Sequence, residues 1–292
     1  MSAVHHEMTS ESTDSTMSLE STLSDEVPKN YQFEDVPFGE GAQGKVYRLK
    51  NDERFVVKKI SVNNPKDATK HKDLRELNVL RTLDRHERIV PFYGYVPLEF
   101  ELLLFMGFME MGSLKQYIRN NGALDEARTR LYTIQILEGV SYLHNLKDPI
   151  IHRDIKGENV LLEDEYHLRL TDFGVSKVIS DLTNARSDIG TFSYRAPETF
   201  DPYKSYDFKA DIWSVGCTVF EMASGTAPFE STFKNQVEAV AGIGEGLRPD
   251  IEFNKCSCNL KKFWDKCFEK DPSQRPTADD LLANDDFLKQ VE

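Results

Sequence analysis

The residues best suited to chemistry form two short stretches, Ile-His-Arg-Asp-Ile-Lys-Gly-Glu-Asn over 151–159 and Thr-Asp-Phe-Gly over 171–174. Asp154 can accept a proton from an incoming hydroxyl group, and Lys156 can stabilise a phosphoryl group during transfer. Asn159 and Asp172 carry the oxygen ligands that suit Mg²⁺, a hard cation. Each residue alone also has a structural explanation, such as a turn aspartate or a capping asparagine, so the hypothesis rests on the whole set.

A glycine-rich stretch near the start of the chain is the second chemical signal, and it reads Gly39-Glu40-Gly41-Ala42-Gln43-Gly44-Lys45-Val46. In a dinucleotide-binding fold a helix would follow the last glycine. Here the sequence continues as a strand through Leu49, so the loop is predicted to join two strands. Such a loop can cover nucleotide phosphates with its backbone N–H groups, because glycines leave room for close approach.

Lys58 lies within an apolar strand, Phe55 to Ile60. A buried lysine needs a counter-charge, and the polar helix predicted over 66–83 offers Glu76. A structural ion pair or an edge lysine in solvent would also fit. Beside the glycine loop, we favour a lysine that binds phosphates.

In this order, the motifs resemble the signature set of eukaryotic protein kinases. The resemblance extends from about Tyr31 to Leu288 and includes three later motifs: Ala196-Pro197-Glu198, Asp211-Ile212-Trp213-Ser214-Val215-Gly216 and Asp271-Pro272-Ser273-Gln274-Arg275-Pro276. It implies an α+β fold with two lobes, a small β-rich N-lobe over about 31–107 and a larger α-helical C-lobe over about 112–288. It also implies that Glu198 and Arg275 form a buried ion pair and that Asp211 holds the backbone of the catalytic loop.

The resemblance assigns ATP and Mg²⁺ as cofactors and gives each site residue a role. Asp154 is then the catalytic base, assisted by Lys156, while Lys58 contacts the α- and β-phosphates and pairs with Glu76. Asn159 and Asp172 are the metal ligands. The implied ATP-contacting residues are Phe38, Gly39, Glu40, Gly41, Ala42, Gln43, Gly44, Lys45, Val46, Val56, Lys58, Met106 and Met109.

Several details resemble the MAP kinase kinase kinase group of serine/threonine kinases. Lys156, two residues after Asp154, and Thr191 are typical of serine/threonine specificity. Gly157 and the phrases over 86–90 and 135–144 are similar to that group, whereas Tyr194 departs from its usual tryptophan. The implied partner is a protein substrate, a MAP kinase kinase. A serine/threonine kinase of another branch, or a pseudokinase scaffold, is the alternative.

Regulation is predicted on the segment before Ala196. In kinases of this kind a phosphate on that segment organises the arginine matching Arg153, and Lys177 could help to bind it. The group's usual acceptor position holds Ile189 here, so Ser187 is our preferred phosphorylation site and Thr183 the second; Thr191 is also counted among the regulatory residues. Alternatively, Asp188 supplies enough negative charge without phosphorylation.

Hydrophobic periodicity predicts the elements that must position these residues. Strands are expected over 33–38, 45–49, 55–60, 89–96 and 101–108. A helix over 66–83 carries a stripe of leucines, Leu74, Leu77, Leu80 and Leu83. A second helix begins near Asp125 as N-cap, and residues 212–222, apolar nearly all round, predict a buried helix. The connection between the lobes is expected near 107–112.

The chain has 292 residues and a net charge of −13, which argues against a surface for nucleic acid or anionic membranes. No apolar run approaches the ~20 residues that span a bilayer, and four cysteines suggest neither a disulfide scaffold nor a zinc site. We therefore expect a cytoplasmic protein without membrane insertion, of unknown oligomeric state. Residues 1–28 hold eleven Ser and Thr, six acidic residues and no Lys or Arg, and are predicted to be a disordered tail.

Overall fold

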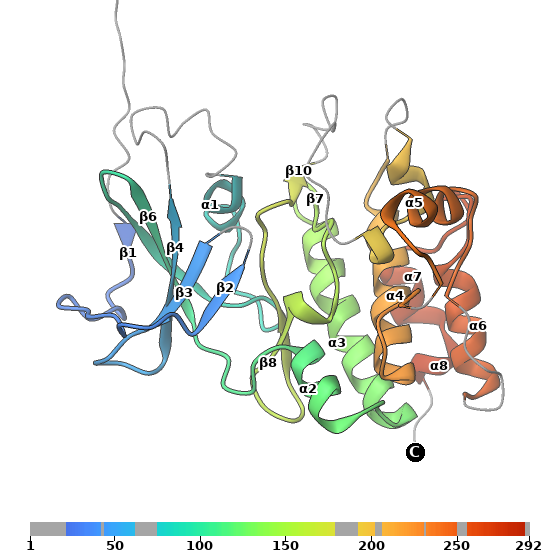
Figure 1. Ribbon diagram of the computed structural model, residues 1–292, viewed down its shortest axis with the longest axis horizontal. Coiled ribbons are helices and arrows are strands. Elements are labelled where there is room, and N and C mark those ends of the chain that lie inside the picture. The colour runs from blue at the N-terminus through green and yellow to red at the C-terminus, as the bar shows by residue number, and fades with distance from the viewer. Residues whose placement is uncertain are drawn as a thin grey trace, which may run out of the picture.

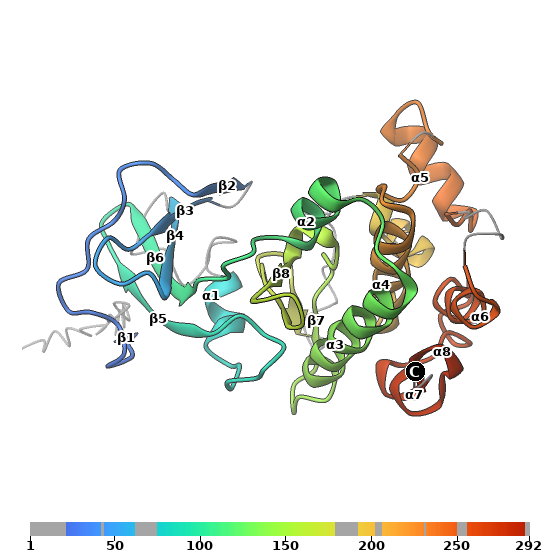
Figure 2. The same cartoon turned by 90° about the horizontal axis from the view of Figure 1, so that it is seen from below.

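The computed structural model describes residues 22–41, 44–61, 75–178, 192–201, 206–230, 232–249 and 256–289. Within these residues, a β-sheet with one helix and a larger helical part lie at opposite ends of the molecule (Figures 1 and 2). The chain leaves the sheet at Gly107 and enters the first helix of the second part at Leu114. The described residues thus have the two-lobed α+β architecture that the sequence predicts.

The N-lobe is a six-stranded antiparallel sheet in the order β1-β5-β6-β4-β3-β2. Its elements are β1 (Thr22–Leu23), β2 (Gly39–Gly41), β3 (Gly44–Arg48), β4 (Phe55–Ser61), α1 (Arg75–Leu80), β5 (Phe92–Pro97) and β6 (Glu101–Gly107). Side chains alternate between faces along β4. Phe55 and Val57 enter a cluster on one face, whereas Val56 and Ile60 join the apolar clusters of the other. Lys58 therefore shares the face of Val56 and Ile60.

The C-lobe is helical, with two short two-stranded sheets, β7 with β10 and β8 with β9. Its elements are α2 (Leu114–Asn121), α3 (Glu126–His144), β7 (Ile150–Ile151), β8 (Val160–Leu162), β9 (Leu168–Leu170), β10 (Lys177–Val178), α4 (Lys209–Ser224), α5 (Gln236–Gly244), α6 (Cys258–Cys267), α7 (Ala278–Asn284) and α8 (Asp286–Lys289). Asp125 caps α3 by accepting a hydrogen bond from the Arg128 amide, as predicted. The predicted buried helix is α4, whose residues from Ala210 to Met222 are all buried.

The strand predicted over 33–38 is wrong, and the strand predicted over 89–96 begins later than expected. Phe33 makes only an isolated bridge with Leu49, and β2 starts at Gly39. Pro37 has no N–H to donate, which interrupts a ladder at this point. In the same way, β5 starts at Phe92 rather than at 89, because Pro91 precedes it and the backbone of Val90 bonds to Leu170 of the other lobe.

Of the helix predicted over 66–83, the described part is α1, Arg75–Leu80. Leu77 and Leu80 are buried in the main core, and Leu83 packs against it from beyond the helix end. Residues 66–74, with Leu74 of the leucine stripe, lie outside the described residues.

The N-terminal segment departs from its prediction. Thr22 and Leu23 are part of the sheet, since they pair with Tyr95 and Gly94 of β5. Val27 is 4% exposed and joins the apolar cluster on the outer face. Disorder is therefore wrong for residues 22–28, because an edge strand offers free backbone partners that composition does not reveal. Residues 1–21 lie outside the described residues.

In the part of the chain that the structure describes, no helix combines the length and the apolar character needed to cross a membrane.

Candidate active site

Lys58 connects three segments of the chain. Its Nζ atom lies 2.9 Å and 2.7 Å from the two carboxylate oxygens of Glu76 on α1. It also lies 3.2 Å from Oδ1 of Asp172, which follows β9 in the C-lobe. Lys58 and Glu76 are 7% and 3% exposed. The predicted pairing of Lys58 with Glu76 is therefore present, and Asp172 is a second partner.

These contacts keep both Lys58 and Asp172 charged. Burial by itself lowers the pKa of Lys58, but the charges of Glu76 and Asp172 outweigh it and raise the pKa above its usual value. Burial by itself raises the pKa of Asp172, yet the Lys58 ammonium and its hydrogen bond lower it overall. The site therefore holds an ammonium and an ionised carboxylate at neutral pH.

Asp211 of α4 fixes the backbone of the 151–159 loop. Its Oδ2 accepts from the His152 amide at 2.8 Å, and its Oδ1 accepts from the Arg153 amide at 2.8 Å. Its Oδ2 also lies 2.9 Å from Nε2 of His144. Burial opposes ionisation of Asp211, but His144 and these donors lower its pKa overall. Arg153 has a φ of 72°, a strained value for a residue with a side chain, and Asp211 holds it there.

Asp154 is oriented by two neighbours from its own loop. Lys156 Nζ donates to both carboxylate oxygens, at 3.1 Å and 2.8 Å. The amide nitrogen of Asn159 donates to Oδ2 and to the backbone carbonyl of Asp154, both at 2.8 Å. Asp154 as a residue is 9% exposed. These hydrogen bonds give its carboxylate one fixed orientation, as a proton acceptor requires.

Asn159 and Asp172 lie on neighbouring segments, because the Thr171 amide donates to the Asn159 carbonyl at 3.0 Å. The Asn159 side-chain nitrogen donates to Asp154, and the side-chain oxygen is the atom that can bind a hard metal ion. Asp172 has a φ of 63°, which turns its backbone into the left-handed region. No group of three or more His, Cys, Asp or Glu able to hold a metal occurs among the described residues. One amide oxygen and one carboxylate fit a Mg²⁺ ion whose remaining ligands are phosphate oxygens and water.

The glycine-rich stretch joins two strands, as predicted. Gly39 pairs with Val46 and Gly41 pairs with Gly44 across β2 and β3. A Cβ atom on Gly44, which has a φ of 138°, would lie 2.2 Å from the Lys59 carbonyl oxygen, so this position requires glycine. Phe38 is 51% exposed beside the loop. Ala42 and Gln43 lie outside the described residues.

Four of the predicted ATP-contacting residues belong to an apolar cluster between the lobes. Val56, Met106 and Met109 are each 6–7% exposed and pack with Val46. The cluster also contains Leu161 of β8 and Val90, which the sequence analysis missed. Leu161 lies two residues after Asn159, and its apolar side chain in a strand was the signal that could have indicated it.

Gly157 is explained by α4. Its amide donates to Oε2 of Glu221 at 3.1 Å, and a Cβ atom at 157 would lie 2.5 Å from the same oxygen. A proline at this position could not donate this bond, because proline has no backbone N–H. Burial, with the nearby charge of Glu158, raises the pKa of Glu221 to about 6.

The predicted ion pair between Glu198 and Arg275 is present, with N–O distances of 2.7 Å and 3.1 Å. Among the regulatory candidates, Arg153 lies on the fixed loop with its guanidinium 5.7 Å from the Tyr206 ring centroid. Lys177 begins β10, which pairs with β7 beside the catalytic loop. Thr183, Ser187 and Thr191 lie outside the described residues.

Comparison with known proteins gives one family and a consistent set of relatives. A family model described as the protein kinase domain matches residues 33–287. Mitogen-activated protein kinase kinase kinase 1a of Physcomitrium patens is 37% identical over 84% of this chain. Mitogen-activated protein kinase kinase kinase 15 of Mus musculus is 36% identical over 98% of the chain. Mitogen-activated protein kinase kinase kinase 5 of Homo sapiens is 36% identical over 91% of the chain.

These relatives are much longer proteins. The matched region covers 32% of the Physcomitrium protein, 22% of the mouse protein and 20% of the human protein. The chain therefore spans a third or less of the length of these curated relatives.

Proposed function

Because this chain belongs to the protein kinase domain family, we propose that it is a serine/threonine protein kinase that phosphorylates MAP kinase kinases. One observation carries the catalytic part of the proposal: the Asp154 carboxylate is held by Lys156 and Asn159 beside the Lys58–Asp172 pair. The relatives named above are described as mitogen-activated protein kinase kinase kinases, and they support the choice of group.

In the proposed reaction, Asp154 accepts the proton of a substrate hydroxyl while the oxygen of that hydroxyl bonds to the γ-phosphorus of ATP. The bond from that phosphorus to the β–γ bridging oxygen breaks, and ADP leaves. Lys58 holds the α- and β-phosphates, and Lys156 stabilises the charge on the transferred group. Bound to Asn159 and Asp172, Mg²⁺ would supply further neutralisation of phosphate charge.

The apolar cluster around Val56, Met106 and Met109 is the surface we assign to the adenine ring, with Leu161 on the opposite side. The glycine loop between β2 and β3 then lies over the phosphates. Under this proposal the protein acts in the cytoplasm on protein substrates. The proposal includes no nucleic-acid substrate or partner.

Replacement of Asp154 by Ala tests the catalytic assignment. We expect loss of phosphotransfer by at least about a hundredfold, with ATP affinity retained, because the base is lost and the phosphate contacts remain. Exposed Asp148 provides a matched control through Asp148→Ala, which should keep full activity. A wild-type protein without ATP-dependent phosphotransfer would favour the pseudokinase alternative instead.

Purified MAP kinase kinases, assayed beside generic serine/threonine peptides, test the choice of substrate. Phosphorylation of peptides alone would place the chain in another branch of serine/threonine kinases.

Ser187→Ala tests the regulatory proposal in the same assay. An activity equal to wild type would exclude phosphorylation of Ser187 as the activating step and favour the Asp188 alternative.

A further inference from the structure

One hairpin sets the distance between the two proposed metal ligands. Asn159 directly precedes β8, and Asp172 follows β9 by two residues. The two strands pair antiparallel from Val160 with Leu170 to Leu162 with Leu168. Any change in this hairpin therefore changes how Asn159 and Asp172 face each other.

The turn of the hairpin, residues 163–167, is exposed throughout. Its internal support is the Asp164 carboxylate, whose Oδ1 accepts from the amides of Tyr166 at 2.7 Å and His167 at 2.9 Å. Three paired positions in each strand make the hairpin short, and a short two-stranded hairpin is marginally stable by itself. Its geometry therefore depends on what it is attached to.

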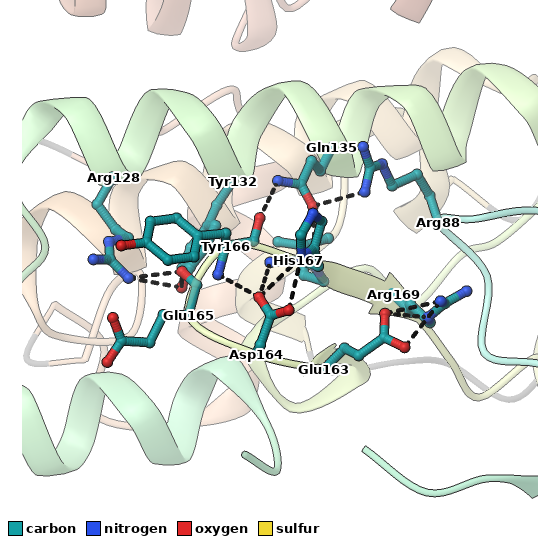
Figure 3. Close-up of polar contacts among 11 residues, drawn as sticks. Arg88, Arg128, Tyr132, Gln135, Glu163, Asp164, Glu165, Tyr166, His167 and Arg169 are labelled. Carbon is teal, nitrogen blue, oxygen red and sulfur yellow. Dashed lines mark hydrogen bonds and ion pairs between the residues drawn. The ribbon is translucent and has the colours of Figure 1, made fainter. Parts of the chain in front are cut away.

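Three side chains of α3 make that attachment (Figure 3): Arg128 and Tyr132 donate to the Glu165 carbonyl at 2.7 Å and 2.8 Å, and Gln135 binds the end of the turn next to β9. Gln135 Nε2 donates to the Tyr166 carbonyl at 2.6 Å, and its Oε1 accepts from the Leu168 amide at 3.0 Å. The same oxygen accepts from a guanidinium nitrogen of Arg88 at 3.0 Å. Gln135 is 3% exposed, so its three partners share one buried side chain. A single amide thus joins the helix, the hairpin and the 88–90 segment.

The 88–90 segment holds the other end of the hairpin. The Leu170 amide donates to the Arg88 carbonyl at 2.8 Å, and the Val90 amide donates to the Leu170 carbonyl at 3.0 Å. Arg88 also donates through Nε to Glu138, at 2.6 Å. At Gly139 a Cβ atom would lie 2.9 Å from a Leu170 methyl group, so the helix can approach β9 closely only with glycine there.

We propose that Gln135 is a positioning residue for phosphoryl transfer. It holds the start of β9 against α3 and Arg88, and thereby fixes Asp172 relative to Asn159. This inference rests on the proposed function, in which these two residues bind Mg²⁺. Residues that hydrogen-bond to metal ligands typically change metal affinity or activity 10- to 100-fold when they are lost. Gln135 acts on Asp172 through β9, so we expect an effect at the lower end of this range.

Gln135→Met is the decisive variant, because methionine keeps the length of the side chain and forms none of the three bonds. We expect the Mg²⁺ concentration for half-maximal activity to rise about tenfold, with an unchanged KM for the peptide substrate. A second readout needs no turnover. In the presence of ADP, Mg²⁺ should raise the melting temperature of the protein, and the Mg²⁺ concentration that gives half of this rise should be about tenfold higher for the variant than for wild type.

Gln135→Glu tests the donor bond to Tyr166. One carboxylate oxygen still accepts from Leu168 and Arg88, but the other would lie 2.6 Å from the Tyr166 carbonyl oxygen and repel it, so a shift in Mg²⁺ dependence of about tenfold is again expected. This variant also decides the question if Gln135→Met does not fold. Thr133→Val is the matched control, since it removes a buried hydroxyl whose bond, to the Thr129 carbonyl at 2.6 Å, stays within α3.

The proposal fails if the Gln135 variants lose thermal stability but keep the Mg²⁺ dependence of wild type and of Thr133→Val. In that case Gln135 has only a structural role. If wild-type protein itself shows neither Mg²⁺-dependent phosphotransfer nor a Mg²⁺-dependent shift with ADP, the proposed function fails instead.

Discussion

At the scale of single residues, the site combines buried charge with backbone strain. Arg153 and Asp172 both have positive φ values, 72° and 63°. Such conformations cost of order 1–3 kcal/mol each for residues other than glycine. Asp211 holds the first through two amide bonds, and Lys58 holds the side chain of the second. The strain is thus maintained by the charged groups that the site requires.

The Lys58–Glu76 pair allows stability and activity to be separated. Lys58→Met leaves the buried Glu76 carboxylate without its cation, and we expect the free energy of unfolding to fall by about 3–5 kcal/mol. Adding Glu76→Leu replaces the pair by apolar side chains and should restore most of that loss. Phosphotransfer should be lost in both variants, because the lysine is absent from both.

Urea unfolding of the wild type, the single variant and the double variant measures this directly, with phosphotransfer measured on the same samples. A double variant no more stable than Lys58→Met would contradict the account. So would recovery of activity together with stability.

At the scale of elements, the sheet is completed by a segment that precedes the matched kinase region. The family match begins at residue 33. Before that residue, β1 already pairs with β5 of the sheet, and Val27 packs in the apolar cluster that contains Phe55 and Val57. β1 covers the backbone of β5, which would otherwise be an open edge strand. Residues 22–28 are therefore a structural part of the N-lobe.

Val27→Asp tests this role. The substitution places a carboxylate among Leu49, Phe55 and Phe105, and burial of an unpaired charge should lower the free energy of unfolding by about 2–4 kcal/mol. Val36→Asp is the matched control, because Val36 is 72% exposed, and it should change stability by less than about 0.5 kcal/mol. Equal effects in chemical denaturation would show that the segment contributes nothing to folding.

At the scale of the whole molecule, residues far apart in sequence hold the catalytic loop between the lobes. Lys58 of the sheet bonds to Asp172 after the hairpin, and Asp211 and Glu221 of α4 accept hydrogen bonds from backbone amides of the loop. Because α4 is buried along most of its length, its charged groups affect the stability of the entire fold.

Glu221 should therefore make global stability depend on pH. Its folded pKa of about 6 lies above the usual 4.5, so the folded state binds more protons between these values. Its contribution to stability falls as pH rises from 4.5 through 6. Glu221→Gln, which still accepts from Gly157, should gain stability over wild type, and this gain should be larger at pH 7.5 than at pH 5 by about 1 kcal/mol.

Urea unfolding at the two pH values measures the difference. Glu110→Gln, at an exposed position, controls for the change in net charge alone. A gain for Glu221→Gln that is the same at both pH values would show that the burial of this carboxylate is not what makes stability depend on pH.

The sequence by itself determined the chemistry and most of the elements. The order of Lys58, Asp154, Asn159 and Asp172, with the glycine loop, indicated the protein kinase family, and the family comparison confirms it. Periodicity located β4, α3 and α4, because each buries one regular face or its whole surface. Local signals also placed the N-cap at Asp125.

Only the tertiary structure decided which distant groups meet. Nothing local in the sequence indicates that Gln135 binds the β8–β9 hairpin, that Gly157 faces Glu221, or that Thr22 and Leu23 pair with β5. Pairing of this kind depends on backbone groups left open by other elements and on side chains brought together by the fold. Neither hydrophobic periodicity nor residue type carries that information, since both describe a segment and not its partner.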